Sequence, residues 1–481
     1  MNIFEYLRGK GIDTVDSSFY RKIDEWKSWY VSNVKKFHFY KVYGGNGTYT
    51  RQRRHSLGMA KTVSEDIANL LLNERGKITM KGNATYDYVK AVLDNSNFTV
   101  MANQYQERKA STGTAAYVPY IVGEIDESGA FLNGDVRVNY LSAGNIFPIS
   151  WDNGEIKECV FMFVKTYRRK KYANFQFHRL ESIADPSAQE PSLQYVVENT
   201  VVECTKGTGR ELKEDEWKQI PCFKEMLPRI ETGSAEPQFV IDKLNITNNA
   251  DDDETNPMGV AIFADAIDVL RKIDTEYDSY ANEFSMGRKR IFVNPTLVEN
   301  ANGEPAFDPS DAVYYRLPED YGKEGETLIK EVDMSLRVEQ HSKAINDDLN
   351  YLSMKCGFGS EHYKFDKGAV KTATEVISEN SDLYRNLKKH ELVLDAALKR
   401  LFRIIIRLGI VCGHTELDPD VEIRIDFDDS IIEDKQSERS QDRSDVSMGV
   451  MSLEEYRAKW YGEDEDVAKS RLPEQKSGVM D

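Results

Sequence analysis

The amino-acid sequence predicts an α+β fold that is divided into more than one domain. Apolar residues recur at helical spacing from residue 257 onward, whereas strand-like alternation dominates residues 115–225. At 481 residues, the chain exceeds the size at which a single hydrophobic core keeps growing. Helices and strands that are segregated along the chain are typical of the α+β class.

The N-terminal segment predicts two helices separated by a glycine-rich turn. Residues 12–40 carry a helical stripe that suits the core or a subunit contact. This stripe consists of Phe19, Ile23, Trp26, Tyr30 and Val34. A turn is expected at 44–47, followed by the basic patch Arg51, Arg53 and Arg54 and by a second helix over 61–74.

Strands are expected over 77–83 and in the region 115–225. The clearest alternation covers 136–140 and 167–177, with turns expected at Asn133-Gly134 and Asp152-Asn153-Gly154. The acidic run 251–254 fits either a hard-cation site or a solvated loop that leads into a helix N-terminus. The loop is the simpler interpretation.

A long amphipathic helix is expected over 257–287, with Pro257 at its first position and Gly287 at its end. One face carries an apolar stripe. The stripe consists of Phe263, Ile267, Leu270, Ile273, Tyr277, Tyr280 and Phe284. A polar face carries Asp265, Asp268, Arg271, Lys272 and Glu276, and the cations Arg288, Lys289 and Arg290 follow the helix.

The remaining segments alternate between compact units and helices. Residues 288–334 contain short strand patterns between prolines, and 335–356 predict a second helix that Gly357 and Gly359 close. A loop is expected over 357–372, a long helix over 373–413, and a strand over 421–427. The tail from 433 onward reads as charged helix, with Leu453, Tyr456 and Trp460 on one side.

Charge and motifs narrow the function classes. The 63 basic and 81 acidic residues give a formal charge of −18, which argues against a protein that grips nucleic acid by neutralising phosphates. No Walker A or H-E-x-x-H motif occurs, and Gly207-Thr208-Gly209 lacks the rest of a dinucleotide fingerprint. Asp426, Asp428 and Asp429 could hold Mg²⁺ for phosphodiester chemistry, but an exposed acidic strand face is the simpler interpretation.

The cysteines and the apolar runs indicate a soluble cytosolic product. The N-terminus carries charges where a signal peptide needs an apolar core, and Arg403 and Arg407 interrupt the run Ile404-Ile405-Ile406. The five cysteines form no C-x-x-C pair and are expected to be buried free thiols. They are Cys159, Cys204, Cys222, Cys356 and Cys412.

Several stretches of the chain resemble one protein family. MGVAIFADAIDVLRKIDTEYDSYANEF (258–284) resembles the first stem helix of portal proteins from siphophages of Gram-positive hosts. GFGSEHYKFDKGAVKTATEVISENSDLYR (357–385) is similar to the loop and helix that follow the second stem helix in that family. DFDDSIIEDKQSE (426–438) and MSLEEYRAKWYGEDEDVAK (451–469) resemble its C-terminal part.

The resemblance implies a portal fold that assembles into a ring, dodecameric in this family, and it assigns a name to each segment. These are an N-terminal wing (1–256), a first stem helix (257–287), a clip (288–334), a second stem helix (335–356), a channel loop (357–372), a long wing helix (373–413) and a C-terminal crown (414–481).

The implied function is structural rather than enzymatic, without a cofactor or a metal. The ring would occupy one capsid vertex of the virion, after assembly in the host cytoplasm, and would pass double-stranded DNA inward during packaging and outward during ejection. The implied partners are the terminase large subunit, the head–tail connector, and the major capsid and scaffolding proteins, with no membrane. Acidic subunits would repel phosphates and leave the duplex loosely held.

Three groups of residues are candidate contacts. A mobile channel loop would present His362, Tyr363, Lys364 and Lys367 to the DNA backbone. The triplet 288–290 would face partners of the clip, or would only be favourable cations at a helix end. The stripe residues Phe263, Ile267, Leu270, Ile273 and Phe284 would pack on a neighbouring stem, because two helices of one subunit leave part of the stripe uncovered.

Two alternatives remain at this stage. The first is a metal-dependent nuclease that uses the carboxylates at 426–429. The second is another ring-forming component, such as a head–tail connector subunit. The length of the chain and its order of helix, small unit, helix and loop disfavour the connector, since connectors are generally much smaller.

Overall fold

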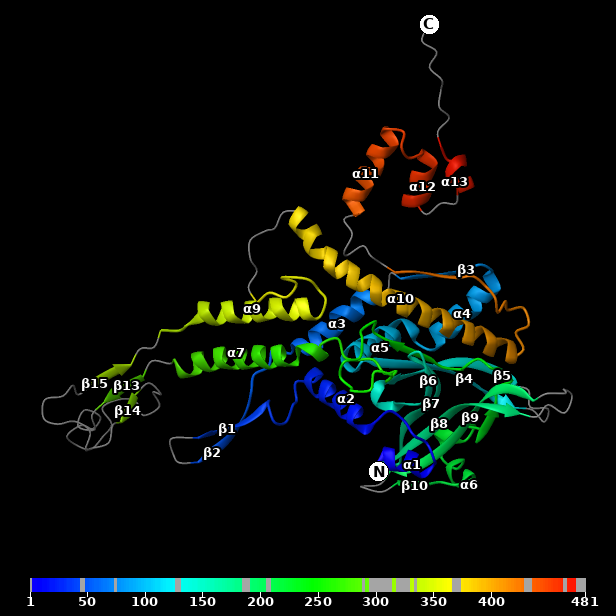
Figure 1. The fold of residues 1–481 in the computed structure, drawn as a ribbon, viewed down its shortest axis with the longest axis horizontal. Coiled ribbons are helices and arrows are strands. Elements are labelled where there is room, and N and C mark those ends of the chain that lie inside the picture. Colours follow the sequence, from blue (N-terminus) through cyan, green and yellow to red (C-terminus); the bar gives the residue numbers. More distant parts are fainter. Residues whose placement is uncertain are drawn as a thin grey trace, which may run out of the picture.

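The computed structural model shows a mixed α/β body from which a long helical hairpin projects (Figure 1). The structure describes residues 2–43, 48–72, 76–125, 131–183, 191–204, 209–287, 290–293, 314–316, 329–332, 335–365, 373–427, 435–461 and 465–472. The predicted turn at 44–47 therefore lies outside the described residues. Within the described helices, none combines the length and the apolar composition needed to cross a bilayer.

The N-terminal part consists of helices and a two-stranded arm. Its elements are α1 (Ile3–Gly9), α2 (Ser17–Tyr30), β1 (Phe39–Tyr43), β2 (Tyr49–Arg53) and α3 (Met59–Leu71). Both α2 and α3 agree with the predicted helices. The aromatic stripe of α2 faces the core of the same subunit, since Phe19, Ile23 and Trp26 are buried.

The larger sheet of the body is antiparallel, with strand order β10-β9-β8-β7-β6 and with β11 beside β9. Its strands are β6 (Ile146–Asp152), β7 (Glu155–Tyr167), β8 (Lys170–Ile183), β9 (Ser192–Cys204), β10 (Gly209–Glu211) and β11 (Arg229–Glu231). Asn153 and Gly154 join β6 to β7 with φ of 49° and 75°. A two-residue Asn-Gly loop with both φ positive is a favoured hairpin turn, so the predicted turn at 152–154 is confirmed.

A second, three-stranded sheet has the order β12-β4-β5. It is formed by β4 (Thr114–Ile125), β5 (Phe131–Ser142) and β12 (Val240–Lys243), and helices α4 (Asn83–Asn95) and α5 (Phe98–Thr112) pack beside it. The turn predicted at Asn133-Gly134 is wrong, because both residues lie inside β5 at a register shift opposite Val122 and Glu124. Glycine is required at 134 by close packing, since a Cβ there would lie 2.6 Å from the Cys412 sulfur.

The projecting hairpin consists of α7 (Ile267–Met286) and α9 (Val338–Lys355). At its far end lie the short strands β13 (Arg290–Val293), β14 (Tyr314–Arg316) and β15 (Ile329–Val332), in the order β14-β13-β15. The predicted start of the first helix at Pro257 is wrong. Residues 257–263 instead pack into the body, where Gly259 N–H donates to Thr114 Oγ1 at 2.9 Å and Ile262 N–H donates to Ala110 O at 2.8 Å.

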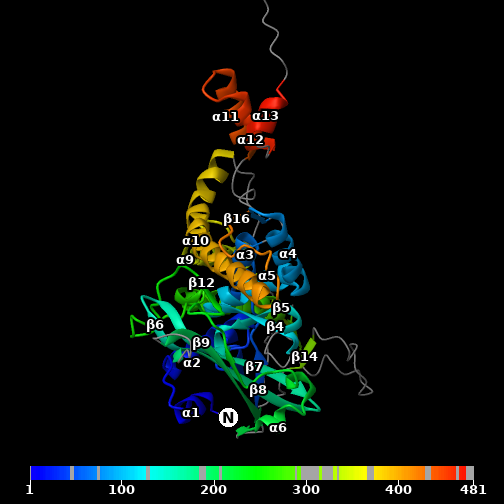
Figure 2. The same ribbon diagram turned by 90° about the vertical axis from the view of Figure 1, so that its right-hand side faces the viewer.

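Helix α10 (Ala373–Val411) crosses the body over α5 and the second sheet (Figure 2), and its bounds agree with the helix predicted over 373–413. Its residues Ile404, Ile405 and Ile406 are buried. Strand β16 (Ile423–Asp426) pairs with β3 (Lys77–Met80). The tail forms α11 (Lys435–Ser447), α12 (Leu453–Tyr461) and α13 (Glu465–Ser470), as its composition predicted.

A fully buried ion pair lies between α5 and the second sheet. Lys109 Nζ is 2.9 Å from Asp242 Oδ1, and the two side chains are 1% and 0% exposed. Gln106 and Tyr117 donate to the second oxygen of the same carboxylate at 2.6 and 3.2 Å. Burial lowers the pKa of Lys109, while Asp242 opposes that change. Removal of one partner from a buried charge pair leaves an uncompensated charge, which is strongly destabilising.

Candidate functional site: the helical hairpin and its anchors

The contact between α7 and α9 is apolar along its centre. Leu270 and Ile273 of α7 face Ile345, Leu349 and Leu352 of α9, and all five side chains are buried. The spacing of three and four residues on each helix places these side chains on one face. The hairpin is therefore held together within one subunit by its own apolar stripe.

This packing changes the predicted subunit contact. The stripe was expected to be only partly covered within the subunit, and Phe263, Leu270 and Ile273 belong to the covered part, being 0%, 3% and 0% exposed. Phe263 precedes α7 and lies in the body core, and α9 helps to cover the other two. Ile267 is half-buried and Phe284 is 46% exposed. A contact of these two residues with a neighbouring stem stays a prediction.

Charged side chains link the two helices on either side of the apolar contact. Near the body, Lys272 Nζ lies 2.7 Å from Asp348 Oδ1, and Glu276 lies beside this pair. Burial, followed by the charge of Asp348, raises the pKa of Glu276 to about 6. Glu276 Oε2 and Asp348 Oδ2 are buried without a hydrogen-bond partner among the described residues. Glu276 therefore takes up a proton more readily than an exposed glutamate as the pH falls.

At the far end of the hairpin, a second cluster joins the helices. Both oxygens of Glu283 accept hydrogen bonds from the Arg337 guanidinium, at 2.9 and 2.8 Å. His341 Nε2 lies 2.9 Å from the same carboxylate. These hydrogen bonds lower the pKa of Glu283 to about 2. The paired, bidentate geometry fixes the spacing of α7 and α9 where the distal strands begin.

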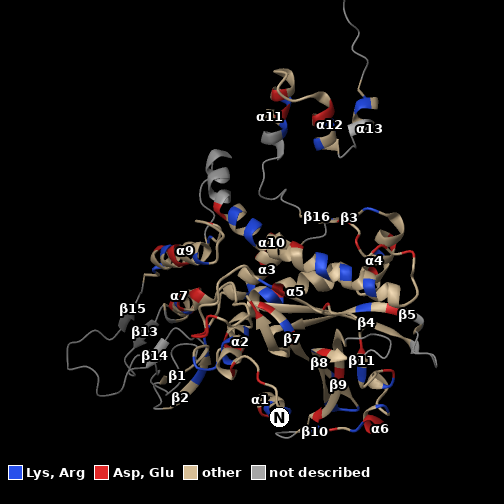
Figure 3. Ribbon diagram, turned by 45° about the vertical axis from the view of Figure 1, so that its right-hand side comes forward, with Lys and Arg blue, Asp and Glu red and all other residues tan. Residues whose placement is uncertain are grey.

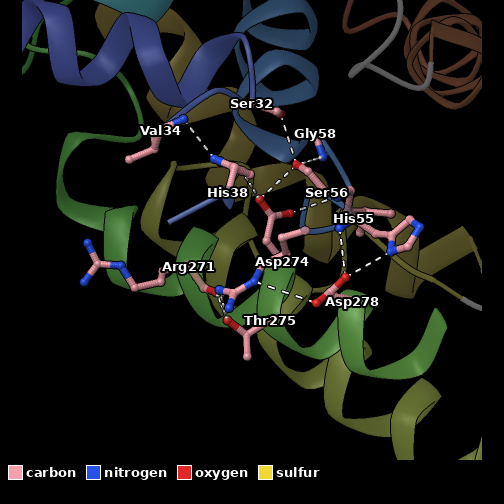
Figure 4. Close-up of polar contacts among 12 residues, drawn as sticks. Ser32, Val34, His38, His55, Ser56, Gly58, Arg271, Asp274, Thr275 and Asp278 are labelled. Atoms are coloured by element: carbon pink, nitrogen blue, oxygen red, sulfur yellow. Dashed lines mark hydrogen bonds and ion pairs between the residues drawn. The ribbon is translucent and has the colours of Figure 1, made fainter. Parts of the chain in front are cut away.

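Two carboxylates on the other side of α7 anchor the segment that contains β1 and β2 (Figure 4). Asp274 is 5% exposed and is surrounded by donors. Leu57 N–H donates to its Oδ1 at 2.9 Å, while Ser56 Oγ–H donates to its Oδ2 at 2.9 Å. His38 Nε2 lies 3.1 Å from Oδ2, and His38 Nδ1 accepts from Val34 N–H at 2.9 Å.

Asp278, one helical turn further along α7, repeats this arrangement. The backbone N–H and the ring Nδ1 of His55 both lie 2.9 Å from Asp278 Oδ1. Tyr40 O–H donates to Oδ2 at 2.9 Å, and Arg54 lies 3.9 Å from it. Burial raises the pKa of Asp278, but the hydrogen bonds from His55 and Tyr40 outweigh it, so the net pKa is lowered.

Serine, histidine and aspartate meet in this cluster, but their hydrogen bonds do not suit nucleophilic catalysis. A catalytic histidine must accept the hydroxyl proton of the serine. Here Ser56 donates to Asp274, and both ring nitrogens of His38 are engaged, one by Val34 N–H and the other by Asp274. The cluster therefore acts as an anchor between α7 and the residues on both sides of the arm.

The described part of the predicted channel loop folds back onto the hairpin. Gly357 and Gly359 adopt φ of 79° and 83°, which favours glycine. Tyr363 O–H donates to Asp66 of α3 at 2.8 Å, and Tyr363 N–H donates to Ser353 Oγ at 3.1 Å. Residues 357–365 are thus held by specific hydrogen bonds rather than left free.

These contacts decide which loop residues remain available. Tyr363 is only 9% exposed and its hydroxyl binds Asp66, which disfavours the predicted contact of its side chain with DNA. His362 is exposed, stacks on the ring of Phe358, and has a pKa lowered by partial burial. Lys364 is paired with Glu361 at 2.8 Å. Lys367 lies outside the described residues, so the contact of this loop with DNA stays a prediction.

The clip triplet is described only in part. Arg290 is the first residue of β13, and its side chain, like Arg288 and Lys289, lies outside the described residues. Its contact with partners therefore stays a prediction.

Among the carboxylates considered as metal ligands, Asp251 and Asp253 have a structural role. Asp251 and Asp253 cap their own loop, accepting hydrogen bonds from Asn256 and Thr255. This loop does not lead directly into a helix, because α7 begins only at Ile267. Asp426 is exposed on β16, while Asp428 and Asp429 lie outside the described residues. No group of three potential metal ligands occurs in the described part of the chain.

The expectation that the cysteines are buried is confirmed at only some positions. Cys159 and Cys356 are buried, Cys204 and Cys412 are half-buried, and Cys222 is exposed, so the predicted burial of Cys222 is wrong. All five carry free thiols.

Sequence reasoning missed the anchor on α7. Asp274 and Asp278 are spaced four residues apart inside an amphipathic helix, next to an apolar position rather than on the predicted polar face. This spacing was the available signal. Their partners lie 217 and 223 positions away along the chain, which no local pattern reports.

Comparison with known proteins places the chain in a class. A family model described as "Phage portal protein, SPP1 Gp6-like" matches residues 10–477. No curated protein sequence matches. Among solved structures, the chain is similar to one in "Neck of native GTA particle computed with C12 symmetry", at 11% identity and a TM-score of 0.42, over 83% of this chain and 88% of that chain.

A second similar structure, "Virion of native gene transfer agent (GTA) particle", covers the same shares at 10% identity and a TM-score of 0.40. The family match spans nearly the whole chain, so the protein is a phage portal protein. Within that class, it belongs to the SPP1 Gp6-like family.

Proposed function

We propose that the protein assembles into a closed ring of twelve subunits at one vertex of a phage capsid, where double-stranded DNA passes through the ring during packaging and ejection. The observation that carries this proposal is the family match over residues 10–477. The projecting hairpin of α7 and α9, with its small distal sheet, supports it as the stem and clip of such a ring (Figure 1).

The stem is proposed to line a stretch of the channel. Helix α7 has 20 residues, which corresponds to roughly 30 Å at 1.5 Å per residue. A ring of subunits with a formal charge of −18 each would repel phosphates and let the duplex slide. His362, Lys364 and Lys367 would be the loop residues that approach the DNA, and their role is electrostatic rather than catalytic.

The clip is proposed to dock the terminase large subunit before packaging and the head–tail connector afterwards. If Arg288, Lys289 and Arg290 face those partners, charge reversal at all three positions will yield normal rings that fail to package. Normal packaging by that variant would leave these cations only a role at the end of α7.

The proposed location follows from the same assembly. The ring would nucleate head assembly with the major capsid and scaffolding proteins in the host cytoplasm and would remain in the finished virion. Ring closure requires a heterologous interface, in which two different surfaces of the subunit meet and the rotation returns on itself.

Imaging the purified protein tests the proposal. Negative-stain averages should show rings with a central hole, and light scattering should return the mass of twelve subunits. Monodisperse monomers under all assembly conditions would contradict the ring. Monomers that also cleave DNA only with Mg²⁺ would support the nuclease alternative instead.

A further inference from the structure

The arm formed by β1 and β2 stands away from the body and from α9 (Figures 1 and 3). Its strands pair antiparallel from Phe39 opposite Arg53 to Tyr43 opposite Tyr49. Tyr43 and Tyr49 are 63% and 68% exposed, and their rings meet edge to face at 5.1 Å. Every described residue of β2 is exposed. A two-stranded hairpin without further cover is marginally stable in water, so this arm requires an explanation.

The anchors on α7 bind both ends of the arm. His38 and Tyr40 precede or begin the arm, and they bind Asp274 and Asp278 respectively. His55, directly after the arm, also binds Asp278. Both ends of the arm are thus fixed to consecutive turns of one helix, which sets its direction relative to the stem. An exposed element held this firmly is suited to meeting a partner.

The arm carries only positive charge. Lys41, Arg51 and Arg53 are its charged residues, and the sequence has no Asp or Glu between 39 and 53. Arg51 lies over the ring of Phe39 at 4.4 Å, and Arg53 donates to Ser32 O at 3.4 Å. No carboxylate of the described residues pairs with any of the three. Their partner should therefore be anionic.

The same chain carries a complementary surface at the base of the stem, here called the acidic patch. It consists of Asp251, Asp252, Asp253, Glu254, Asp265 and Asp268. All except the half-buried Asp251 are exposed, and the side chain of Asp268 is 94% exposed. Hydrogen bonds within the loop and from Asn249 to Asp265 fix several of these carboxylates. The only close cation within the described residues is Arg271, 3.4 Å from Asp268.

The arm and the acidic patch lie at different positions around α7, and Arg271, which contacts Asp268, also lies 5.9 Å from the ring of Phe37 just before the arm. Asp268 precedes Asp274 by six positions, which places the two side chains about 120° apart around a helix with 3.6 residues per turn. The arm is anchored on the Asp274 side and makes no ion pair with the patch of its own subunit in the described residues. Two complementary surfaces that are not paired with each other within one copy suit a head-to-tail ring contact.

We propose that the arm of one subunit docks on the acidic patch of the next copy of this chain, so that it forms part of the ring contact. This inference rests on the proposed ring. Phosphates of DNA would be the other source of negative charge. A second copy is favoured because the exposed Tyr43 and Tyr49 and the open strand edges also need cover, which a protein surface provides.

Charge swapping tests the pairing. Reversal of the arm (Lys41→Glu with Arg51→Glu), or of the patch (Glu254→Lys with Asp268→Lys), should each raise the protein concentration needed for ring assembly by about tenfold or more. The combined variant should restore assembly. The control Lys22→Glu with Lys27→Glu, on exposed positions of α2, should assemble like the unaltered protein.

Cysteine cross-linking gives a second readout, which reports directly whether the two surfaces lie side by side. In a Cys222→Ser background, Tyr43→Cys combined with Asp252→Cys should give a ladder of linked subunits on a non-reducing gel. Each single cysteine variant should give no ladder. Thermal melts of every variant confirm that the subunit is folded.

The outcomes separate this inference from the ring itself. If the unaltered protein forms rings and the arm reversal leaves their assembly unchanged, the inference is overturned while the proposed function stands. If that variant also loses affinity for a short DNA duplex, measured by fluorescence anisotropy, the arm is a DNA contact instead. Failure of the unaltered protein to form rings contradicts the proposed function directly.

Discussion

Asp274 and Asp278 lie one helical turn apart on α7, and they bind the backbone N–H groups of Leu57 and His55, each at 2.9 Å. Sequence-distant segments are therefore joined by charge-assisted hydrogen bonds at the base of the hairpin. Removal of either carboxylate leaves buried donors without an acceptor, which is costly.

Asp274→Ala should lower the free energy of unfolding by about 2–4 kcal/mol, because three donors lose their acceptor in a buried site. Urea denaturation measures this change. Asp268→Ala, at an exposed position on the same helix, should change it by less than about 0.5 kcal/mol. Equal effects of the two substitutions would show that the hydrogen bonds of Asp274 add no more stability than an exposed aspartate does.

Glu276 should make stability depend on pH in a narrow window. Its folded pKa of about 6 lies above the ordinary value of 4.5, so the folded state holds the proton more tightly. The stabilisation is complete below the unfolded value and is lost as the pH rises through the folded one.

Glu276→Gln removes the titrating carboxyl group, so the variant does not lose this stabilisation as the pH rises. At neutral pH the variant should be more stable than the unaltered protein by about 1 kcal/mol, since the carboxyl is partly solvated, and below pH 4.5 the difference should vanish. Thermal melts across this pH range provide the measurement, with Glu254→Gln on an exposed loop as the control. A difference that stays constant with pH would rule out titration of Glu276 as the cause.

Substitutions at two positions of α7 distinguish an effect on folding from an effect on ring assembly. Leu270→Asp should unfold the subunit, because it places a charge in a side-chain position that is only 3% exposed. Phe284→Asp, at a position that is 46% exposed, should leave the subunit folded and weaken rings if a neighbouring stem covers it. Circular dichroism and light scattering distinguish the two effects. Intact rings from Phe284→Asp would remove this residue from the contact.

The loop after α9 should depend on one hydroxyl. Tyr363→Phe removes the hydrogen bond to Asp66 and should cost about 1 kcal/mol. Hydrogen exchange of the backbone over 359–365 should become faster, while Tyr351→Phe, on the exposed face of α9, should leave it unchanged. Unchanged exchange in the first variant would mean that the backbone contacts hold the loop unaided.

The buried pair in the body should show strong coupling. Asp242→Ala leaves the Lys109 ammonium buried and unpaired and should cost about 3–5 kcal/mol. Lys109→Met combined with Asp242→Ala should cost much less than Asp242→Ala alone, because neither charge remains. A double-mutant cycle by urea denaturation measures this coupling. Additive losses would contradict it.

Local patterns predicted the helices and much of the strand region. Apolar residues recur at helical spacing in α2, α3, α7, α9 and α10, and Asn153-Gly154 forms the turn between β6 and β7. The same pattern wrongly predicted a turn at Asn133-Gly134, where Gly134 instead packs closely against Cys412. A dipeptide sequence indicates which backbone conformations are accessible to it, but it does not indicate which residues pack against it.

The candidate site was predicted in outline and not in its contacts. The sequence predicted the two helices of the hairpin, because each is encoded by residues close together in the chain. It did not place the start of α7, since residues 257–263 have apolar character that suits either a helix or a buried segment.

The sequence by itself determined the periodicity, the charge and the order of segments, which are properties of neighbouring residues. Only the tertiary structure decided which side chains are covered, that Tyr363 binds Asp66, and that Asp274 and Asp278 hold the arm. These outcomes depend on hydrogen bonds and packing between residues more than two hundred positions apart, and a helical stripe is equally consistent with cover from α9 or from another subunit.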